Sequence, residues 1–312
     1  MLTRRGLRIK VMQVLYMVEQ DQQHASVSGL LKTAIQNTYK SYLNVLDVLV
    51  ILSEAVEQEA ERRKAKYIPK DEDLSFNTVF ADNICMQYLK HAEGIKRELK
   101  NEQIGNANEE ELIGSIYGEL KVFEPYVKYI NQKEYVIDDH RKILRDICKD
   151  FLPANEAFDQ YMEASVPTWA DDELIVLKKV DETLRALPLS QEKEDLMLHY
   201  ELPEEEIEFA ETLMNACIEE SGRFDQMIIE KLKNWELDRV SLIDRILMKL
   251  AVTEFLYLPT VPLKVSINEY LEISKLYSTP KSREFINGVL DKIMIELKAS
   301  GEVIKTGRGL IE

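Results

Sequence analysis

Apolar residues recur along almost the whole chain at the spacing of three and four residues that places them on one face of an α-helix. Alternation of apolar and polar residues between turn signals, which is typical of strands, is scarce. The pattern therefore predicts an all-α protein. The predicted helices cover residues 3–20, 27–62, 76–100, 108–131, 137–151, 154–165, 170–187, 203–221, 223–233, 238–257, 262–276 and 280–298.

The helix predicted at 280–298 contains an Asn-Gly pair, although this pair favours a turn and glycine in a helix costs about 1 kcal/mol relative to alanine. The apolar period of Phe285, Val289 and Ile293 nevertheless continues through Asn287 and Gly288. A small residue at this position suggests that something approaches the helix closely. Tight packing between helices of the chain is the alternative explanation.

Proline and polar residues predict where several helices begin and where loops lie. Pro262 and Pro280 stand where a first helical residue is expected, and Thr279 is the candidate N-cap. Two polar stretches, 64–75 and 101–108, are predicted loops.

The net charge of the 312-residue chain is −16, which on average repels the phosphate backbone of a nucleic acid. The distribution is uneven, however. Residues 1–20 carry a net +3, residues 21–200 a net −12, residues 201–258 a net −8 and residues 259–312 a net +1. The two ends of the chain are therefore the candidates for anion binding.

The sequence contains no recognisable set of catalytic or metal-binding residues. Its three cysteines are far apart, its four histidines are scattered, and no glycine-rich phosphate loop is present. The one local cluster, Asp138-Asp139-His140, is interpreted as surface charge. We therefore expect a protein that is not an enzyme and that needs no cofactor and no metal.

The chain has no credible signal peptide, because Arg8 and Lys10 interrupt its first apolar run. The most apolar stretch, residues 45–52, contains Asp47 and is too short to span a bilayer. A cytoplasmic protein without a membrane partner is expected.

Residues 152–184 and 218–250 show a faint internal repeat with an offset of 66 residues. Phe158-Asp-Gln160 matches Phe224-Asp-Gln226, Trp169 matches Trp235, and Asp172 matches Asp238. The repeat suggests a duplicated helical module whose first copy is degenerate. Two amphipathic hairpins that merely look alike are the alternative.

The first predicted helix combines basic side chains with an aromatic one. Arg4, Arg5 and Arg8 fall on one arc near its beginning, and Tyr16 lies on the flank of Arg5 about three turns along. Phosphate contacts followed by an aromatic face are the combination that single-stranded RNA binding uses. A solvated basic helix end with a half-buried tyrosine is the alternative.

The last predicted helix carries Lys281 and Arg283 in its first turn, where the helix dipole makes positive charge unfavourable. This cost is understandable if the site meets an anion, since free N–H groups and nearby bases attract phosphate together. Phe285 could supply a stacking face for a base. Ordinary surface charge and an ordinary core phenylalanine are the alternatives.

Several segments resemble the NusB family of bacterial transcription antitermination factors. Arg4-Arg5-Gly-Leu-Arg8 followed by Val14-Leu15-Tyr16 resembles the beginning of the family, and the segment 237–255 resembles its central core helix. The run from Pro262 to Lys275 and the run from Phe285 to Ile293 resemble its end.

The resemblance implies a NusB-like helical bundle formed by residues 1–20 and 205–299, enlarged by a helical insertion at 21–204. The insertion could be partly a degenerate duplicate, given the repeat. Residues 300–312 are expected to be a flexible tail. Fusion to a ribosomal RNA methyltransferase, which the family also shows, is not expected, because no glycine-rich dinucleotide-type motif is present.

By the same resemblance, the chain would bind boxA-type single-stranded RNA together with a small-subunit ribosomal protein, NusE, and would join RNA polymerase and other Nus factors. The resemblance also implies a partner surface in the C-terminal helical half, with Asp244 and Glu254 as candidate contacts. The expected RNA-binding residues are Arg4, Arg5, Arg8, Tyr16, Lys281, Arg283, Phe285 and Asn287. The alternative is a scaffold that kept the fold, binds proteins and has lost RNA contact.

Overall fold

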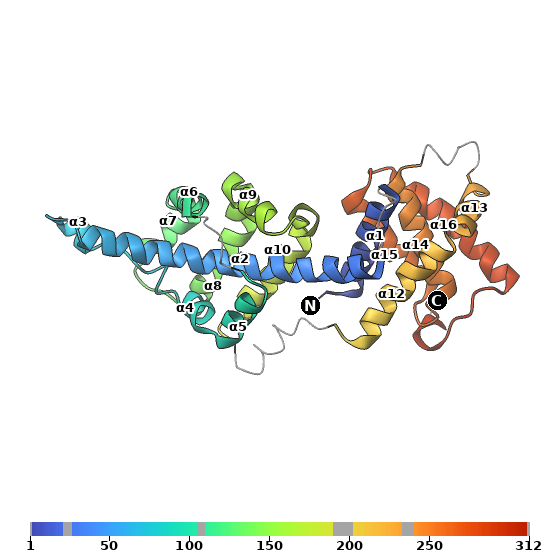
Figure 1. Cartoon of the computed structure of the whole chain (residues 1–312), viewed down its shortest axis with the longest axis horizontal. Helices are drawn as coiled ribbons and strands as arrows, with labels where there is room; N and C mark the ends of the chain where they lie inside the picture. Colours follow the sequence, from blue (N-terminus) through green and yellow to red (C-terminus); the bar gives the residue numbers. More distant parts are fainter. Residues whose placement is uncertain (1, 21–26, 105–109, 190–201, 233–239, 311–312) are drawn as a thin grey trace. The chain divides into compact units, whose positions relative to one another are not determined.

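The computed structural model describes residues 2–20, 27–104, 110–189, 202–232 and 240–310, and within these ranges every regular element is a helix. The prediction of an all-α protein is confirmed. The chain forms two compact units, coloured along the sequence in Figure 1. Unit 1 comprises Gln36–Tyr200, and unit 2 comprises Leu2–Ile35 and Glu201–Glu312.

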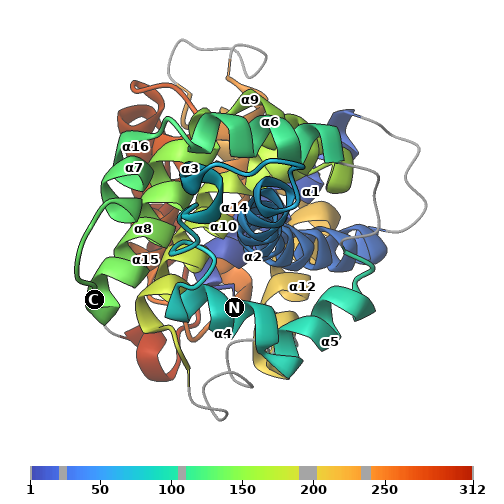
Figure 2. The same ribbon diagram turned by 90° about the vertical axis from the view of Figure 1, so that its left-hand side faces the viewer.

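Unit 1 is built around the long helix α2, which begins in unit 2 and ends in unit 1. Figure 2 looks along α2, with the shorter helices of unit 1 arranged around it. The elements are α2 (Val27–Lys64), α3 (Asp71–Leu74), α4 (Ile84–His91), α5 (Glu93–Asn101), α6 (Glu110–Leu120), α7 (Glu124–Ile130), α8 (Ile137–Asp146), a π-helical turn (Ile147–Phe151), a 3₁₀ turn (Leu152–Ala154), α9 (Glu156–Ser165) and α10 (Trp169–Ala186).

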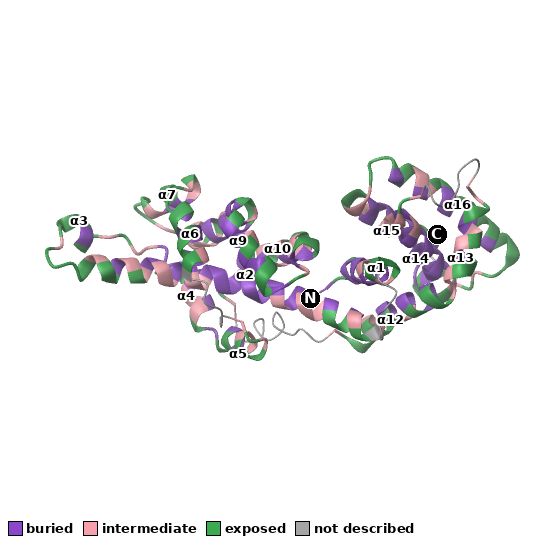
Figure 3. Ribbon diagram, turned by 45° about the horizontal axis from the view of Figure 1, so that its top comes forward, coloured by how far each residue is buried: buried purple, intermediate pink, exposed green. Residues whose placement is uncertain are grey.

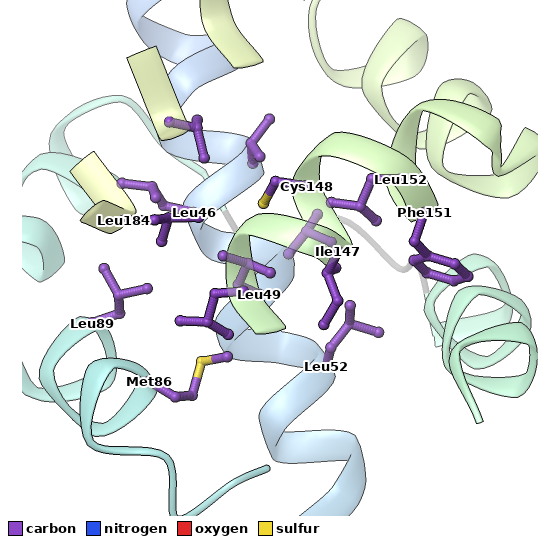
Figure 4. Packing of buried hydrophobic residues seen from close by; sticks show 14 of the residues in the cluster. Leu46, Leu49, Leu52, Met86, Leu89, Ile147, Cys148, Phe151, Leu152 and Leu184 are labelled. Carbon is purple, nitrogen blue, oxygen red and sulfur yellow. The ribbon is translucent and has the colours of Figure 1, made fainter. Parts of the chain in front are cut away.

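The middle of α2 is buried on all sides, which explains its nearly continuous apolar sequence. Figure 4 shows Leu46, Leu49 and Leu52 of α2 among side chains from α4, the π-helical turn and α10. A helix of this composition inside a helical protein is a core element. None of the described helices combines the length and the apolar composition that crossing a bilayer requires.

Unit 2 is a helical bundle centred on α14 (Leu242–Tyr257), which packs against α1, α12, α13, α15 and α16. Figure 3 shows α14 buried along most of its length. The other elements are α1 (Arg4–Gln20), α12 (Glu204–Glu219), α13 (Ser221–Ile229), α15 (Leu263–Tyr277), α16 (Ser282–Ser300) and a 3₁₀ turn, η4 (Gly307–Leu310). The core of the bundle therefore joins the first helix of the chain to the last ones.

Most predicted helices are present, but two predicted long helices are each divided in two. The expected helix 76–100 begins only at Ile84, because the Asn83 side chain accepts hydrogen bonds from the Cys85 and Met86 amides and caps the helix there. The expected helix 108–131 is interrupted before Pro125, which lies in the first turn of α7. Polar capping and proline geometry thus overrode the apolar period.

The predicted cap of the last helix is wrong. Lys281 occupies the N-cap position of α16, and Thr279 instead shares a hydrogen bond of 2.8 Å with the Ser282 hydroxyl. Pro262 likewise precedes α15 as its N-cap residue and is not its first helical residue.

The described part of the expected flexible tail makes specific contacts. Lys305 donates hydrogen bonds to the backbone carbonyls of Glu254 and Leu258, at 2.8 and 2.9 Å. Gly309 is buried so close to the Pro259 carbonyl that a Cβ atom there would collide with it. Residues 300–310 therefore differ from the expectation, because this glycine and this lysine attach them to the loop after α14.

The internal repeat is tested only in its first copy. Phe158 and Trp169 are buried and meet edge to face, with ring centroids 5.6 Å apart. Phe224 is also buried, but Trp235 and Asp238 lie outside the described residues. Duplication therefore stays a prediction.

Candidate nucleic-acid interface

Arg8, on the second turn of α1, lies inside unit 2 and not on its surface. Its guanidinium binds both carboxylate oxygens of Glu254 on α14, at 2.6 and 3.1 Å, and its side chain is only 4% exposed. Ser266 and Tyr270 of α15 donate to the same carboxylate, at 2.6 and 2.7 Å. Three helices therefore meet at one fully buried carboxylate.

The electrostatics of this cluster keep Arg8 ionised. Burial by itself would lower the pKa of Arg8, but the adjacent Glu254 carboxylate raises it above its ordinary value. Burial and the same negative charge raise the pKa of Tyr270, which therefore stays a hydrogen-bond donor. The cluster is a structural joint between α1, α14 and α15.

These contacts overturn three predictions about individual residues. The prediction that Arg8 contacts RNA is wrong, because its charge is already paired away from solvent. The prediction that Glu254 contacts a protein partner is wrong for the same reason. Asp244 is also buried, and it accepts hydrogen bonds from Ser278 and Ser282, at 2.6 and 2.8 Å, so it anchors the beginning of α16 and does not form a partner surface.

Arg4 and Arg5 remain at the surface, and each is paired with a carboxylate from a distant part of the sequence. Arg4 binds Glu206 of α12 at 3.0 Å, with its guanidinium 5.0 Å from the Phe209 ring centroid. Arg5 binds both oxygens of Glu269 on α15, at 2.7 and 2.8 Å. Exposed pairs of this kind contribute about 0–1 kcal/mol each, so an incoming phosphate can share or replace the carboxylate at little cost.

The beginning of α1 and the beginning of α16 are brought into one electrostatic neighbourhood. Glu272 of α15 has its pKa lowered first by a hydrogen bond from Lys275 and then by the positive charges of Arg283 and Arg5. Glu269, one turn earlier, has its pKa lowered by its hydrogen bond from Arg5, with further contributions from Arg8. Arg5 and Arg283, 278 positions apart, therefore act on the same stretch of α15.

The first turns of α16 present the remaining candidates at the surface. Lys281 and Arg283 are exposed, and Phe285 and Asn287 are half-buried. The Asn287 amide donates to Asp291 one turn later, at 3.0 Å. The buried Ser282 hydroxyl donates a hydrogen bond to Asp244 and so fixes the beginning of α16, from which these side chains extend.

Gly288 is exposed, and apart from its chain neighbours and the nearby backbone of its own helix, no atom of the described residues lies within 4 Å of the position that a Cβ atom would take. In the part of the chain that the structure describes, no other helix packs closely against this position, so the alternative of tight packing between helices is wrong there. What remains is an open strip on α16 beside Phe285 and Asn287, where an external partner could approach the backbone.

Tyr16 lies near the end of α1, where its side chain is 38% exposed. The apolar face beside it is buried as the period predicted, with Leu7, Val11, Val14 and Leu15 in the core. Tyr16 therefore has a free edge at the surface, three turns from Arg5.

Sequence reasoning missed Glu206, Glu269 and Glu272, although they set the charge of this surface. Pairs separated by 202 and 264 positions leave no local signal in the sequence. It also missed the exposed acidic face of α12, where Glu204, Glu208 and Glu211 recur at helical spacing. That spacing was readable and is the clearest overlooked signal for a basic partner.

The cluster interpreted as surface charge is partly internal. Asp138 is exposed and pairs with Arg141, but the His140 ring shares a hydrogen bond of 2.7 Å with the Tyr129 hydroxyl. Burial lowers the pKa of His140, against the opposing effect of Asp139. Within the described ranges, no group of three or more His, Cys, Asp or Glu side chains is arranged to hold a metal ion.

Comparison with known proteins identifies one family. A sequence model of the NusB family matches residues 174–294, so the match begins within α10, before the boundary predicted at 205. A curated transcription antitermination protein NusB of Chloroherpeton thalassium is 40% identical over 137 residues, covering 42% of this chain and 65% of the relative.

Two further relatives carry the same name. That of Salinibacter ruber is 45% identical over 104 residues, covering 33% of this chain and 65% of the relative. That of Bacillus pumilus is 35% identical over 122 residues, covering 39% of this chain and 93% of the relative. The chain thus spans about two thirds of the length of the first two relatives, at 65% each. No solved structure matches the chain.

Proposed function

The chain belongs to the NusB family, and from that premise we propose that it is a transcription antitermination factor without enzymatic activity that binds boxA-type single-stranded RNA. In this proposal it acts with a small-subunit ribosomal protein, NusE, and joins RNA polymerase and other Nus factors. The names of the relatives support the general role, and the surface of unit 2 supports RNA binding.

The observation that carries the proposal is that Arg5 and Arg283 both lower the pKa of Glu272 on α15. The half-buried Phe285 follows Arg283 by two positions on α16. Two positive charges from distant segments suit successive phosphates, and the phenylalanine ring suits stacking by an unpaired base. Arg4, Lys281 and Asn287 extend the proposed surface, with Tyr16 at the far end of α1.

Gly288 fits the same proposal. Its exposed, open position allows an RNA backbone to approach α16 without meeting a side chain. Without such a role, a glycine at an exposed helical position would destabilise the helix by about 1 kcal/mol relative to alanine, and no contact among the described residues compensates for this.

A basic ribosomal protein would suit the acidic exposed face of α12. Glu204, Glu208 and Glu211 lie on one side of that helix, and residues 201–258 carry a net −8. Opposite charge favours fast association and correct orientation of such a partner. This face replaces Asp244 and Glu254 as the proposed partner surface.

Fluorescence anisotropy with a labelled boxA-type RNA, with and without the ribosomal protein and across a salt series, tests the proposal. We expect the ribosomal protein to tighten binding. The variant Arg5→Gln/Arg283→Gln should flatten the slope of log K against log salt by about 1.4, since each lost phosphate contact on a single strand contributes about 0.7. Phe285→Ala should weaken binding about tenfold through lost stacking.

Lys298→Gln is the matched control, because Lys298 is exposed on the same helix but lies about four turns from Arg283. A separate variant, Glu208→Gln/Glu211→Gln, removes negative charge from the proposed partner surface. It should weaken the effect of the ribosomal protein, while RNA alone still binds. If the ribosomal protein binds and the RNA does not at any salt concentration, the chain is a protein scaffold. The pairing of Arg4 and Arg5 with carboxylates is the observation that favours this second function.

A further inference from the structure

The turn that joins α2 to α3 concentrates positive charge in an otherwise acidic segment. Residues 21–200 contain 22 basic and 34 acidic residues, yet five of the basic ones fall within the nine positions 62–70, which contain no acidic residue. We name residues 62–70 the basic turn. Its basic residues are Arg62, Arg63, Lys64, Lys66 and Lys70.

The same turn exposes large apolar side chains. Tyr67 is 100% exposed and Ile68 is 77% exposed, and Leu74 of the adjoining α3 is 55% exposed. Figure 3 shows this end of unit 1 in green around α3. Single exposed apolar residues are common, but neighbouring ones at the tip of a helix point to an interaction site.

The basic turn is held in place by specific contacts. The buried Asp73 carboxylate accepts hydrogen bonds from Lys66 Nζ at 2.6 Å and from the Lys70 amide at 3.1 Å. Arg63 lies over the Phe76 ring, 4.4 Å from its centroid, and binds Glu59. These contacts fix the backbone on both sides of Tyr67, so the tyrosine is presented at low entropic cost.

The remaining basic side chains of the turn are available. Lys64 and Lys70 are exposed, and neither pairs with a carboxylate in the part of the chain that the structure describes. Tyr67 makes no hydrogen bond within those residues either. Two unpaired positive charges therefore flank an aromatic ring that solvent reaches on every side.

We propose that the basic turn is a second RNA-binding site, which takes single-stranded RNA with little sequence preference. The exposed ring of Tyr67 stacks on an unpaired base, and Lys64 and Lys70 bind the flanking phosphates. One tyrosine, one isoleucine and one leucine are a small apolar anchor for a bilayer, where a broad amphipathic face is usual. The short turn is also small against the roughly 800 Å² that each partner buries in a stable protein interface.

The basic turn lies outside residues 174–294, which the NusB family model matches. RNA binding there would be independent of the proposed boxA-type surface on unit 2. It would give the positions 21–204 a role in holding the transcript, in spite of their net negative charge.

The test uses the full chain and labelled oligouridine of about 15 nucleotides, within the range of known single-strand site sizes. We expect Tyr67→Ala to weaken binding about tenfold and Tyr67→Phe, which keeps the ring, to bind like the wild type. Lys64→Gln/Lys70→Gln should flatten the salt slope by about 1.4. Lys133→Gln/Lys149→Gln changes the charge equally at two other exposed lysines of unit 1 and should leave the slope unchanged.

A double-stranded RNA of the same length and anionic phosphatidylserine vesicles complete the experiment. The Tyr67→Ala variant should bind the duplex like the wild type, because paired bases offer no free face. The proposal would be overturned if Tyr67→Ala weakened binding of the duplex and of the single strand equally. It would also be overturned if neither Tyr67→Ala nor Lys64→Gln/Lys70→Gln weakened binding of oligouridine. Binding to vesicles that depends on Tyr67, with no such dependence for RNA, would overturn it in favour of a lipid surface.

Testing the variants of each site with the RNA assigned to the other site distinguishes the two proposed sites. Arg5→Gln/Arg283→Gln should weaken binding of boxA-type RNA and keep the binding of oligouridine that depends on Tyr67. If no boxA-type RNA binds but oligouridine still requires Tyr67, the proposed function fails and the basic turn stands.

Discussion

The two units use charge in different ways. Among the described residues, unit 2 buries three basic side chains, Arg8, Lys10 and Lys249, and the acidic Asp244 and Glu254. Unit 1 buries no basic side chain in its described part, and its core is a large apolar cluster around α2. In unit 2 charge joins helices, whereas in unit 1 the basic residues remain at the surface. A basic residue of unit 2 can therefore lie in the core or at the surface, whereas the described basic residues of unit 1 are exposed or half-buried.

The largest effect is expected from breaking the buried joint of unit 2. Glu254→Ala leaves the Arg8 charge buried without its partner, which costs about 3–5 kcal/mol. Hydrogen exchange of α1 and α15 amides, resolved by peptide, measures the loss. Glu206→Gln is the control, because its pair with Arg4 lies at the surface and should cost less than about 1 kcal/mol. Equal costs for the two variants would remove the contrast between buried and exposed charge.

The corresponding change in unit 1 removes apolar volume. Leu49→Ala, at a fully buried position of α2, should cost about 2–5 kcal/mol through lost burial and the cavity that remains. Hydrogen exchange of the α2 and α8 amides reports it. Leu74→Ala, at an exposed position, should change the free energy of unfolding by less than about 0.5 kcal/mol. If Leu49→Ala also changed the free energy of unfolding by less than about 0.5 kcal/mol, α2 would not organise the core.

A smaller effect, in the opposite direction, is expected at Gly288. Gly288→Ala should stabilise unit 2 by about 1 kcal/mol, because the position is helical, exposed and open. The same variant should bind boxA-type RNA more weakly if the backbone approaches there. Thermal unfolding and anisotropy measure the two effects separately. Higher stability with unchanged RNA binding would exclude close approach of RNA to α16.

The smallest effect concerns Lys305, which donates hydrogen bonds to two backbone carbonyls of unit 2. Partial burial lowers its pKa from 10.5 to about 8, against the opposing charge of Glu254. Between pH 8 and 10.5 the unfolded chain binds more protons at this lysine than the folded one, so stability rises with pH in that window.

The stability of the wild type relative to Lys305→Met should therefore increase from pH 8 to 10.5 and stay constant below pH 8. We expect less than about 1 kcal/mol, because much of the side chain remains in contact with water, which screens the charge. Urea unfolding at several pH values measures the difference. A difference that does not vary with pH would show that Lys305 keeps its ordinary pKa in the folded chain.

Much of the secondary structure was predictable because helices depend on local spacing. The predicted helices 3–20 and 262–276 each lie within one residue of α1 and α15. The missed interruptions have local causes too, the cap formed by Asn83 and the proline of α7, but each competes with an apolar period that continues past it. The resemblance to the NusB family was readable from the C-terminal runs and is confirmed.

The sequence by itself determined that the chain is all-helical, that it belongs to its family, and where positive charge gathers along it. Only the tertiary structure decided which charges face solvent. Arg5 and Arg8 look alike in the sequence. Arg5 lies at the surface, whereas Arg8 is buried and binds a carboxylate 246 positions away. The physical reason is that burial of a charge depends on a partner brought by helix packing, and helix packing joins residues with no relation in sequence.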